Sequence, residues 1–257
     1  MLLAFDLDKT IVTSSYELPQ EIIDTILKVK EAGHYVSVLT GRPLAATLEY
    51  LYLLEIDSYY SVNHGSFVVG KDGEILRKSF IDAEHASEVM KPFSKHPEIE
   101  YSFVLDDVLY VKDPNDERWA WAHTANRYVK LFDPAANLAA DKIVFSANGL
   151  SPEIHKHVST INRDLVCYLW DDHYVEVTAK DADKGSALAL IAGELGVAQK
   201  DVIAFGDGAN DVSMIGWAGK GIAVGDFAIK DVLELADEHI ASPEELGVKH
   251  WLEANLL

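Results

Sequence analysis

The stretch LLAFDLDKT, residues 2 to 10, sets four apolar residues directly before two aspartates, Asp6 and Asp8. A short apolar run that ends in polar residues is typical of a strand buried on both faces, as in a parallel sheet. Ligands of open parallel sheets bind beyond the carboxyl ends of the strands, so both carboxylates are expected at a ligand site. The pair alone is weak evidence, because a chain with 42 acidic residues contains roughly seven such spacings by chance.

The residues that follow this strand alternate between short apolar runs and amphipathic segments, the pattern of a parallel sheet with helical crossovers. Within the first 80 residues we predict a helix at 19–32, a strand at 35–40, a helix from Pro43 to Glu55, a strand at 59–63 and a hairpin around KDG at 71–73. The alternation returns after residue 180 with a helix at 181–196, a strand at 201–206, a helix at 211–219 and strands at 222–225 and 238–242. Asp183 is the expected N-cap of the first of these helices.

Residues 81 to 180 have a different texture, with a helix, neighbouring strands and a concentration of aromatic residues. We therefore predict an α/β fold with a doubly wound parallel-sheet, Rossmann-like core formed by 1–80 and 181–257, interrupted by an α+β cap domain at 81–180. Such an insert would exclude water from the site and contact the substrate. The side chains with a suitable chemistry for a sugar are Trp119, Trp121, His123, Trp170, Asp172 and His173, although packing is the commoner role of such residues.

The composition narrows the classes of function. Lys and Arg number 22 against 42 Asp and Glu, a net charge of −20 that opposes binding to nucleic acid or an anionic membrane. No run reaches membrane-spanning length, and the apolar stretch at the N-terminus is too short for a signal peptide, so we expect a cytoplasmic protein. The single cysteine, Cys167, excludes an internal disulfide and a Cys-rich zinc site. We expect a monomer or a weak homo-oligomer.

Three further groups of polar residues lie where the predicted strands end or a helix begins. They are Thr40, Gly41 and Arg42 after the second strand, Lys184 at the start of a helix, and Asp207, Asn210 and Asp211 after the strand VIAFG. Each group has an ordinary explanation as a turn, a cap or a solvated side chain. Their joint occurrence at positions that converge in a doubly wound sheet favours a site.

These residue types suit phosphoryl transfer, which needs a nucleophile, neutralisation of the phosphate oxygens and an acid for the leaving group. Asp6 is the candidate nucleophile and Asp8 the candidate acid and base. Asp6 and Asp207, with a main-chain carbonyl, offer the hard oxygen ligands that Mg²⁺ prefers. The phosphate would be held by groups at the other positions, namely Thr40, Gly41, Arg42 and Lys184.

The sequence resembles the haloacid dehalogenase (HAD) superfamily, specifically the Cof-type sugar phosphatases of subclass IIB with a C2 cap. The resemblance runs nearly end to end and lies chiefly in DLDKT (6–10), LTGR (39–42), DKGSAL (183–188) and GDGANDVSM (206–214). It implies that Asp8 also binds the metal through its main-chain carbonyl and that Asp207 completes the ligation. It further implies that Asn210 contacts phosphate and that Asp211 orients Lys184 or a metal-bound water.

The chain departs from this family at three places near the expected site. Lys9 stands where the family usually has glycine, and we expect its side chain to point outward. His64 follows Asn63 where the family commonly has a glycine-alanine pair. AVGDF, with Asp226 and Phe227, stands where the family has AVGNA. The changes at His64 and in AVGDF leave the reacting groups intact and concern the shape of the substrate rim.

The expected activity is a Mg²⁺-dependent phosphatase that hydrolyses a small phosphorylated metabolite, foremost a sugar phosphate, through an aspartyl-phosphate on Asp6. A phosphosugar mutase uses the same motifs, and pyridoxal phosphate or a nucleotide is an alternative substrate. A receiver-like signalling module fits less well, because it has neither a cap nor a need for Asp8. A non-catalytic descendant of the fold would be expected to lose Asp6, Asp8 or Lys184, and all three are present.

Overall fold

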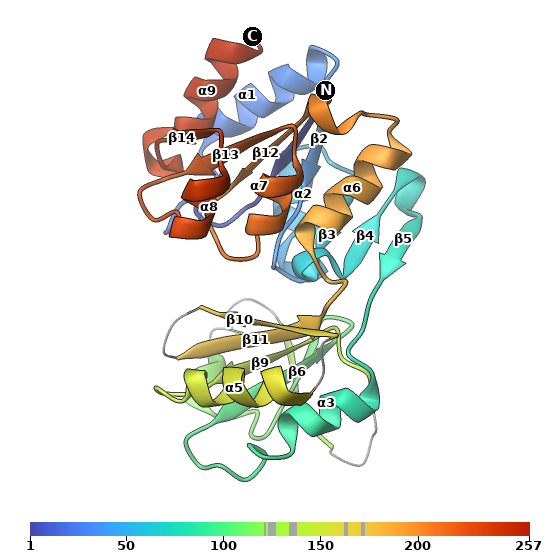
Figure 1. Cartoon of the computed structure of the whole chain (residues 1–257), viewed down its shortest axis with the longest axis vertical. Coiled ribbons are helices and arrows are strands. Elements are labelled where there is room, and N and C mark those ends of the chain that lie inside the picture. The colour runs from blue at the N-terminus through green and yellow to red at the C-terminus, as the bar shows by residue number, and fades with distance from the viewer. Residues whose placement is uncertain (121, 123–126, 134–137, 162–163, 171–172) are drawn as a thin grey trace. The chain divides into compact units, whose positions relative to one another are not determined.

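Five parallel strands form the central sheet of the first part of the chain (Figure 1). The computed structural model describes residues 1–257 except 121, 123–126, 134–137, 162–163 and 171–172. In sheet order the strands are β14 (Glu238–Ile240), β13 (Lys220–Val224), β12 (Val202–Gly206), β1 (Leu2–Phe5) and β2 (Tyr35–Val38). The chain proceeds outward from the middle in both directions, so the direction of winding changes between β1 and β12. Ligands of doubly wound sheets bind at such a change.

Helices cover both faces of this sheet, which explains the uninterrupted apolar runs of β1 and β12. One face packs against α1 (Gln20–Glu31), α2 (Leu48–Leu53) and α9 (Gly247–Asn255). The other packs against α6 (Lys184–Glu194), α7 (Val212–Trp217) and α8 (Lys230–Leu235). Alternate residues of β1 divide between these cores, with Leu3 and Phe5 in the first and Leu2 and Ala4 in the second.

The predicted helix from Pro43 to Glu55 is broken in the structure. A 3-10 turn spans Leu44–Ala46, and the regular helix α2 begins only at Leu48. Between them the buried Thr47 donates its hydroxyl to the carbonyl of Pro43 at 2.9 Å. A side chain that bonds to its own backbone in this way competes with a regular helical turn, which accounts for the shorter helix.

A small antiparallel sheet follows α2 along the chain. Its strands are, in order, β3 (Tyr60–Val62), β4 (Phe67–Val69) and β5 (Ile75–Lys78). The predicted KDG hairpin is confirmed, since Lys71–Gly73 joins β4 to β5 with Asp72 and Gly73 both at positive φ. Asp183 is confirmed as the N-cap of α6, where its carboxylate accepts the amide proton of Ser186 at 2.7 Å.

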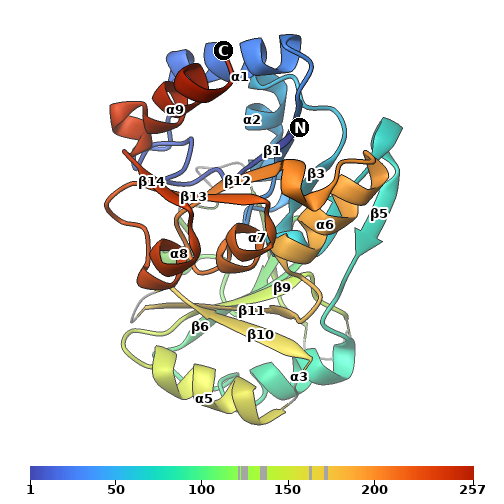
Figure 2. The same ribbon diagram turned by 45° about the horizontal axis from the view of Figure 1, so that its top comes forward.

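The chain divides into two compact units. The first contains Met1–Pro43, Thr47–Lys78 and Asp183–Leu257, and the second contains Leu44–Ala46 and Ser79–Ala182. The second unit is built on a six-stranded sheet in the order β10 (Leu165–Leu169), β11 (Tyr174–Ala179), β9 (Lys142–Ser146), β6 (Glu100–Leu105), β7 (Val108–Val111) and β8 (Tyr128–Leu131). The helices α3 (Ala83–Met90) and α5 (Ser151–Ile161) lie on one side of these strands (Figure 2). The predicted α/β core with an additional α+β unit is therefore observed.

Within the described part of the chain, every helix falls short of the length and apolar content that crossing a membrane requires.

Candidate active site

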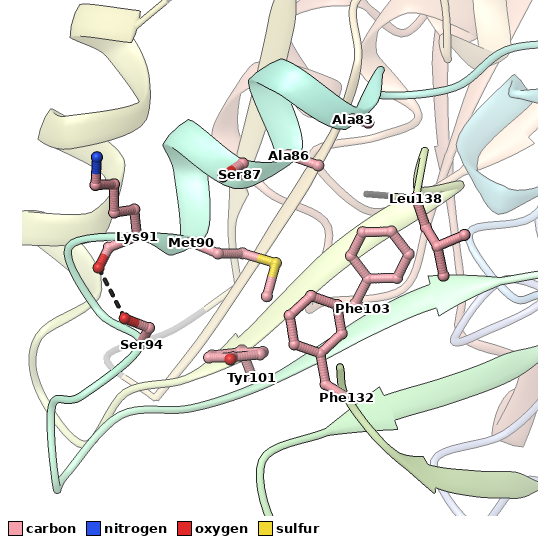
Figure 3. A pocket seen from close by; sticks show the side chains of 10 residues that line it. All are labelled: Ala83, Ala86, Ser87, Met90, Lys91, Ser94, Tyr101, Phe103, Phe132 and Leu138. Carbon is pink, nitrogen blue, oxygen red and sulfur yellow. Dashed lines mark hydrogen bonds between the residues drawn. The ribbon is translucent and has the colours of Figure 1, made fainter. Parts of the chain in front are cut away.

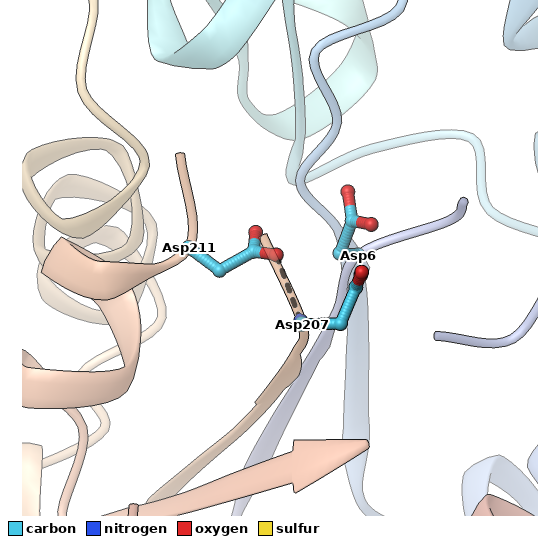
Figure 4. Close-up of side chains that lie close together, drawn as sticks. All are labelled: Asp6, Asp207 and Asp211. Atoms are coloured by element: carbon cyan, nitrogen blue, oxygen red, sulfur yellow. Dashed lines mark hydrogen bonds between the residues drawn. The ribbon is translucent and has the colours of Figure 1, made fainter. Parts of the chain in front are cut away.

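The carboxyl ends of β1 and β12 bring three buried aspartates together (Figure 4). Asp6 follows β1 and Asp207 follows β12, while Asp211 lies at the start of α7. One carboxylate oxygen from each residue lies within 4.8 Å of the others. These three residues, which the sequence placed after two predicted strands, form an acidic cluster in the structure. We call it the Asp6 cluster.

Lys184 supplies the positive charge inside the Asp6 cluster. Its side chain is fully buried, and Nζ donates to Asp6 Oδ1 and to Asp211 Oδ1, each at 2.6 Å. Burial alone lowers the pKa of a lysine, but the charges of Asp211 and Asp6 outweigh it and raise the pKa of Lys184 above its usual value. The ammonium is therefore charged and fixed between two carboxylates.

Asp211 has both of its carboxylate oxygens occupied. Besides accepting from Lys184 through Oδ1, it accepts through Oδ2 from the backbone N–H groups of Asp207 and Gly208, at 3.0 and 2.9 Å. A carboxylate with three such donors is held in one orientation. Asp211 thus holds the Nζ of Lys184 and the loop after β12 in place.

The Asp6 cluster carries more negative charge than Lys184 neutralises. Three ionised carboxylates and one ammonium leave a charge of −2 in a buried place. Burial raises the pKa of Asp6 well above its ordinary value despite Lys184, with a further contribution from the neighbouring carboxylates. Burial and the charge of Asp211 raise the pKa of Asp207 to about 7. Protons or a cation are needed to balance this site, and carboxylate oxygens are the ligands that Mg²⁺ prefers.

The loop after β2 brings Thr40, Gly41 and Arg42 to the same edge of the sheet. Thr40 is buried, and its Oγ1 accepts the backbone N–H of Arg42 at 3.1 Å, which leaves its hydroxyl proton for another acceptor. Gly41 lies against two side chains: a Cβ there would be 3.1 Å from Asn210 Nδ2 and 2.9 Å from His64 Nδ1. Glycine is required at this point of close approach.

Arg42 and Asp8 form an ion pair that the sequence did not predict. The guanidinium donates through Nε to Asp8 Oδ2 at 2.8 Å and through Nη2 to Asp8 Oδ1 at 2.5 Å. It also lies over the ring of Tyr50 at 4.7 Å. In the structure Arg42 thus holds Asp8, the candidate acid and base, and its assignment to the phosphate stays a prediction.

Sequence reasoning gave Thr10 no role, and it placed His64 near the site without assigning it a role; both lie in the site. Thr10 donates its hydroxyl to Asp207 Oδ1 at 3.3 Å, and His64 Nδ1 lies 3.0 Å from the amide nitrogen of Asn210. Both follow predicted strands closely, which is the signal that could have found them. Lys9 is exposed, as expected, with φ of 60° and Nζ 5.9 Å from the ring of Phe227.

The aromatic candidates of the second unit divide into three groups. Trp119 is 1% exposed and packs with Val104, Leu109, Val111 and Ala122, so it is a core residue. Trp170 is exposed and stacks on Tyr168 at 6.0 Å, and His173 is exposed. Trp121, His123 and Asp172 lie outside the described residues.

A cavity of about 170 Å³ lies within the second unit beside α3 (Figure 3). Met90, Phe103 and Phe132 supply much of its apolar wall, and Lys91 and Ser94 lie at one end. None of the predicted site residues is among the side chains that line it. The Asp6 cluster, and not this cavity, has the groups that phosphoryl transfer needs.

Comparison with known proteins identifies the family. Residues 3–252 match the haloacid dehalogenase-like hydrolases. The chain belongs to this family. It is a phosphatase of the haloacid dehalogenase superfamily, that is, a phosphoric monoester hydrolase.

Among its relatives is the 5-amino-6-(5-phospho-D-ribitylamino)uracil phosphatase YitU of Bacillus subtilis, with 27% identity over 98% of this chain and 96% of that protein. The solved haloacid dehalogenase subclass IIB sugar phosphatase BT4131 is 25% identical, covers 98% of each chain and superposes with a TM-score of 0.84. SMU.1108c of Streptococcus mutans, at 21% identity and a TM-score of 0.87 over 99% of this chain and 98% of that one, shows the same fold.

Proposed function

We propose that this protein is a Mg²⁺-dependent phosphatase that transfers the phosphoryl group of a small sugar phosphate to Asp6 and then to water. The observation that supports this most strongly is the position of Asp6, at the change of winding direction and 2.6 Å from a buried lysine. A carboxylate at that place has the electrostatic partner that an anionic substrate requires. The same place lies beside the two other aspartates of the cluster.

The metal site consists of the carboxylates of Asp6 and Asp207 together with the main-chain carbonyl of Asp8. Asp211 already accepts three hydrogen bonds, so we assign it to holding Lys184 and the loop after β12 and not to direct ligation. A divalent cation would balance the charge of −2 that the cluster has when all three carboxylates are ionised, which is why the residues fit the ion. When bound, Mg²⁺ neutralises phosphate oxygens and lowers the repulsion between the substrate and Asp6.

Asp6 is the nucleophile. One carboxylate oxygen attacks phosphorus, the bond from phosphorus to the ester oxygen breaks, and an aspartyl-phosphate forms. Lys184 keeps Asp6 oriented through the bond to Oδ1 and contributes positive charge at the phosphoryl group. Thr40, Gly41 and Asn210 supply hydrogen-bond donors to the other phosphate oxygens.

Asp8 is the acid and base. In the first step its carboxyl proton passes to the leaving ester oxygen, and in the second its carboxylate takes a proton from the water that attacks phosphorus, which releases phosphate and restores Asp6. Arg42 orients Asp8 by the paired hydrogen bonds. We therefore assign Arg42 to Asp8 first, and to phosphate only when that pair opens.

We assign substrate discrimination to the second unit.

The sugar phosphatase BT4131 shares both the fold and 25% identity with this chain. The name of the relative YitU states a phosphate ester on a ribityl chain. Both support a phosphorylated sugar or sugar derivative over pyridoxal phosphate or a nucleotide, and both favour hydrolysis over a mutase.

The test is a hydrolysis screen with sugar phosphates, nucleotides and pyridoxal phosphate, with Mg²⁺ and with a chelator. We expect Mg²⁺-dependent phosphate release that is greatest for sugar phosphates and abolished in Asp6→Asn. Substrate labelled with ³²P should transfer acid-stable label to the wild type and none to that variant. Hydrolysis that survives both the substitution and chelation would contradict the mechanism. Interconversion of sugar phosphates with little phosphate release would show a mutase.

A further inference from the structure

The loop Asn63–Gly65 has an unusual backbone and joins the separate parts of the site. Its three residues have positive φ angles of 49°, 59° and 99°. Two consecutive non-glycine residues in this region cost free energy and persist only where their surroundings fix them. The fixing contacts are present: the N–H of Asn63 donates to Arg42 O at 2.8 Å, and the N–H of His64 donates to Thr40 O at 3.0 Å.

The third residue of the loop fixes its other side. A Cβ on Gly65 would lie 2.6 Å from the carbonyl carbon of Asp183, the N-cap that precedes Lys184. The loop is thus held between the turn that carries Thr40 and the start of α6. It contacts two of the three segments that supply the predicted phosphate ligands.

The imidazole of His64 extends this contact to the third segment. Only 1% of the residue is exposed, and Nδ1 lies 3.0 Å from the amide nitrogen of Asn210. An amide NH₂ group only donates, so Nδ1 accepts and the ring proton resides on Nε2. The same ring closes over Gly41, where a Cβ would overlap Cε1. His64 therefore touches two of the groups assigned to the phosphate.

We propose that His64 is a positioning residue for the phosphate-holding groups, and that it acts by fixing the Asn210 amide and the Gly41 turn. One N–H of Asn210 binds His64, which orients the second N–H for a phosphate oxygen. The packing of the ring against Gly41 fixes the backbone N–H groups of that turn. This inference rests on the proposed function, because it presupposes that Asn210 and Gly41 bind phosphate.

Two substitutions separate the imidazole from the backbone. Glycine accepts the φ of 59° at no cost but removes the ring, whereas asparagine also tolerates this conformation and retains an acceptor near the place of Nδ1. For His64→Gly we expect the inhibition constant of inorganic phosphate and the KM for substrate to rise about 10-fold, the effect of one lost hydrogen bond near its upper range. For His64→Asn we expect both within about 3-fold of wild type.

A charged variant keeps the inference testable if His64→Gly does not fold. His64→Asp has nearly the shape of His64→Asn but adds a negative charge next to the phosphate groups, so it should weaken phosphate binding at least about 10-fold more than His64→Asn. The matched control is His34→Gly. His34 precedes the amino end of β2 and so lies at the opposite edge of the sheet. This substitution should leave the inhibition constant of phosphate and the KM unchanged.

A double substitution tests the contact with Gly41. Gly41→Ala should lower kcat/KM by at least about 10-fold in the wild type and by less in His64→Gly, where the overlapping ring is absent. Equal losses in both backgrounds, or wild-type phosphate affinity in a folded His64→Gly protein, would overturn the role of His64. In that case Asp6→Asn would still abolish the activity. If the proposed function itself were wrong, the result would be different, because hydrolysis would then survive Asp6→Asn.

Discussion

The Arg42 guanidinium holds the Asp8 carboxylate by two hydrogen bonds, and its Cζ lies 4.7 Å from the centre of the Tyr50 ring. The paired geometry fixes the plane of the carboxylate as well as its distance. Burial lowers the pKa of an arginine, but the bonds to Asp8 outweigh this and raise the pKa of Arg42 above its usual value. Asp8 is thus oriented by a permanent cation before any substrate is bound.

The loss of Asp8 should depend on the leaving group of the substrate. A sugar alkoxide needs a proton as it leaves, whereas p-nitrophenolate does not. We expect Asp8→Asn to lower kcat about 100-fold or more for a sugar phosphate, within the usual range for a general acid, and by a much smaller factor for p-nitrophenyl phosphate. Steady-state kinetics with the two substrates measures the difference.

Arg42→Lys tests the orientation of Asp8 separately from its presence. Lysine retains the charge but cannot form two parallel hydrogen bonds. We expect kcat for a sugar phosphate to fall about 10-fold, with a smaller effect on p-nitrophenyl phosphate. An equal loss with both substrates would show that Arg42 acts on the phosphate and not through Asp8.

Removal of Lys184 should destabilise the protein, because it leaves the three buried carboxylates of the Asp6 cluster without their ammonium. For Lys184→Met in metal-free buffer at pH 7.5 we expect the free energy of unfolding to fall by about 3 kcal/mol, typical of a broken buried ion pair. Denaturant unfolding measures it. Lys184→Met combined with Asp211→Asn should recover part of the loss, since the second change removes one of the stranded charges. A combined variant that is less stable than Lys184→Met would refute this account.

The strands that position the site could be predicted from sequence, and the contacts between its loops could not. LLAF and VIAFG are apolar because both faces of β1 and β12 are covered by helices, and that pattern is visible in the chain itself. The convergence of Asp6 and Asp207 can be predicted from the ends of these strands. The break in the helix after Pro43 cannot, because Thr47 bonds to a backbone carbonyl in a segment with good helical periodicity.

Contacts between loops escaped prediction for a physical reason. Arg42 and Asp8 are 34 residues apart, and His64 and Asn210 are 146 apart. Which side chains meet depends on the conformation of each turn, as in the positive φ of His64, and periodicity carries no information about it. The residue types at the site were therefore predictable, whereas the partner of Arg42 was not.

Cys167 should react slowly with thiol reagents in the native protein. It lies partly buried in β10, and burial raises the pKa of its thiol to about 12. Only the thiolate is reactive, so we expect labelling by a disulfide reagent at pH 8 to be at least about 100-fold slower than after denaturation. Rapid native labelling would contradict the burial, and Cys167→Ala provides the blank.

The charge imbalance of the Asp6 cluster should make stability without metal depend on pH through Asp207. Its pKa is raised from 3.8 to about 7 in the folded protein, so the folded state binds a proton that the unfolded chain has released. This proton stabilises the folded state fully below about pH 4. As the pH rises from about 4 to about 7 the stabilisation is lost, and the free energy of unfolding falls by at most about 4 kcal/mol. Asp207→Asn lacks the titration and should gain stability over wild type, in chelator, as the pH increases from 5 to 8.

Mg²⁺ should reverse the difference in stability between Asp207→Asn and the wild type. At pH 8 a Mg²⁺ concentration 100 times the dissociation constant would stabilise the wild type by about 2.7 kcal/mol, and Asp207→Asn by much less because it has lost a ligand. Thermal unfolding of both proteins, with Mg²⁺ and with chelator at each pH, gives the four curves required. Asp201→Asn is the matched control, since Asp201 lies before the opposite end of β12 and should respond to Mg²⁺ as the wild type does. If Mg²⁺ stabilises Asp207→Asn as much as the wild type, Asp207 is not a ligand of the ion.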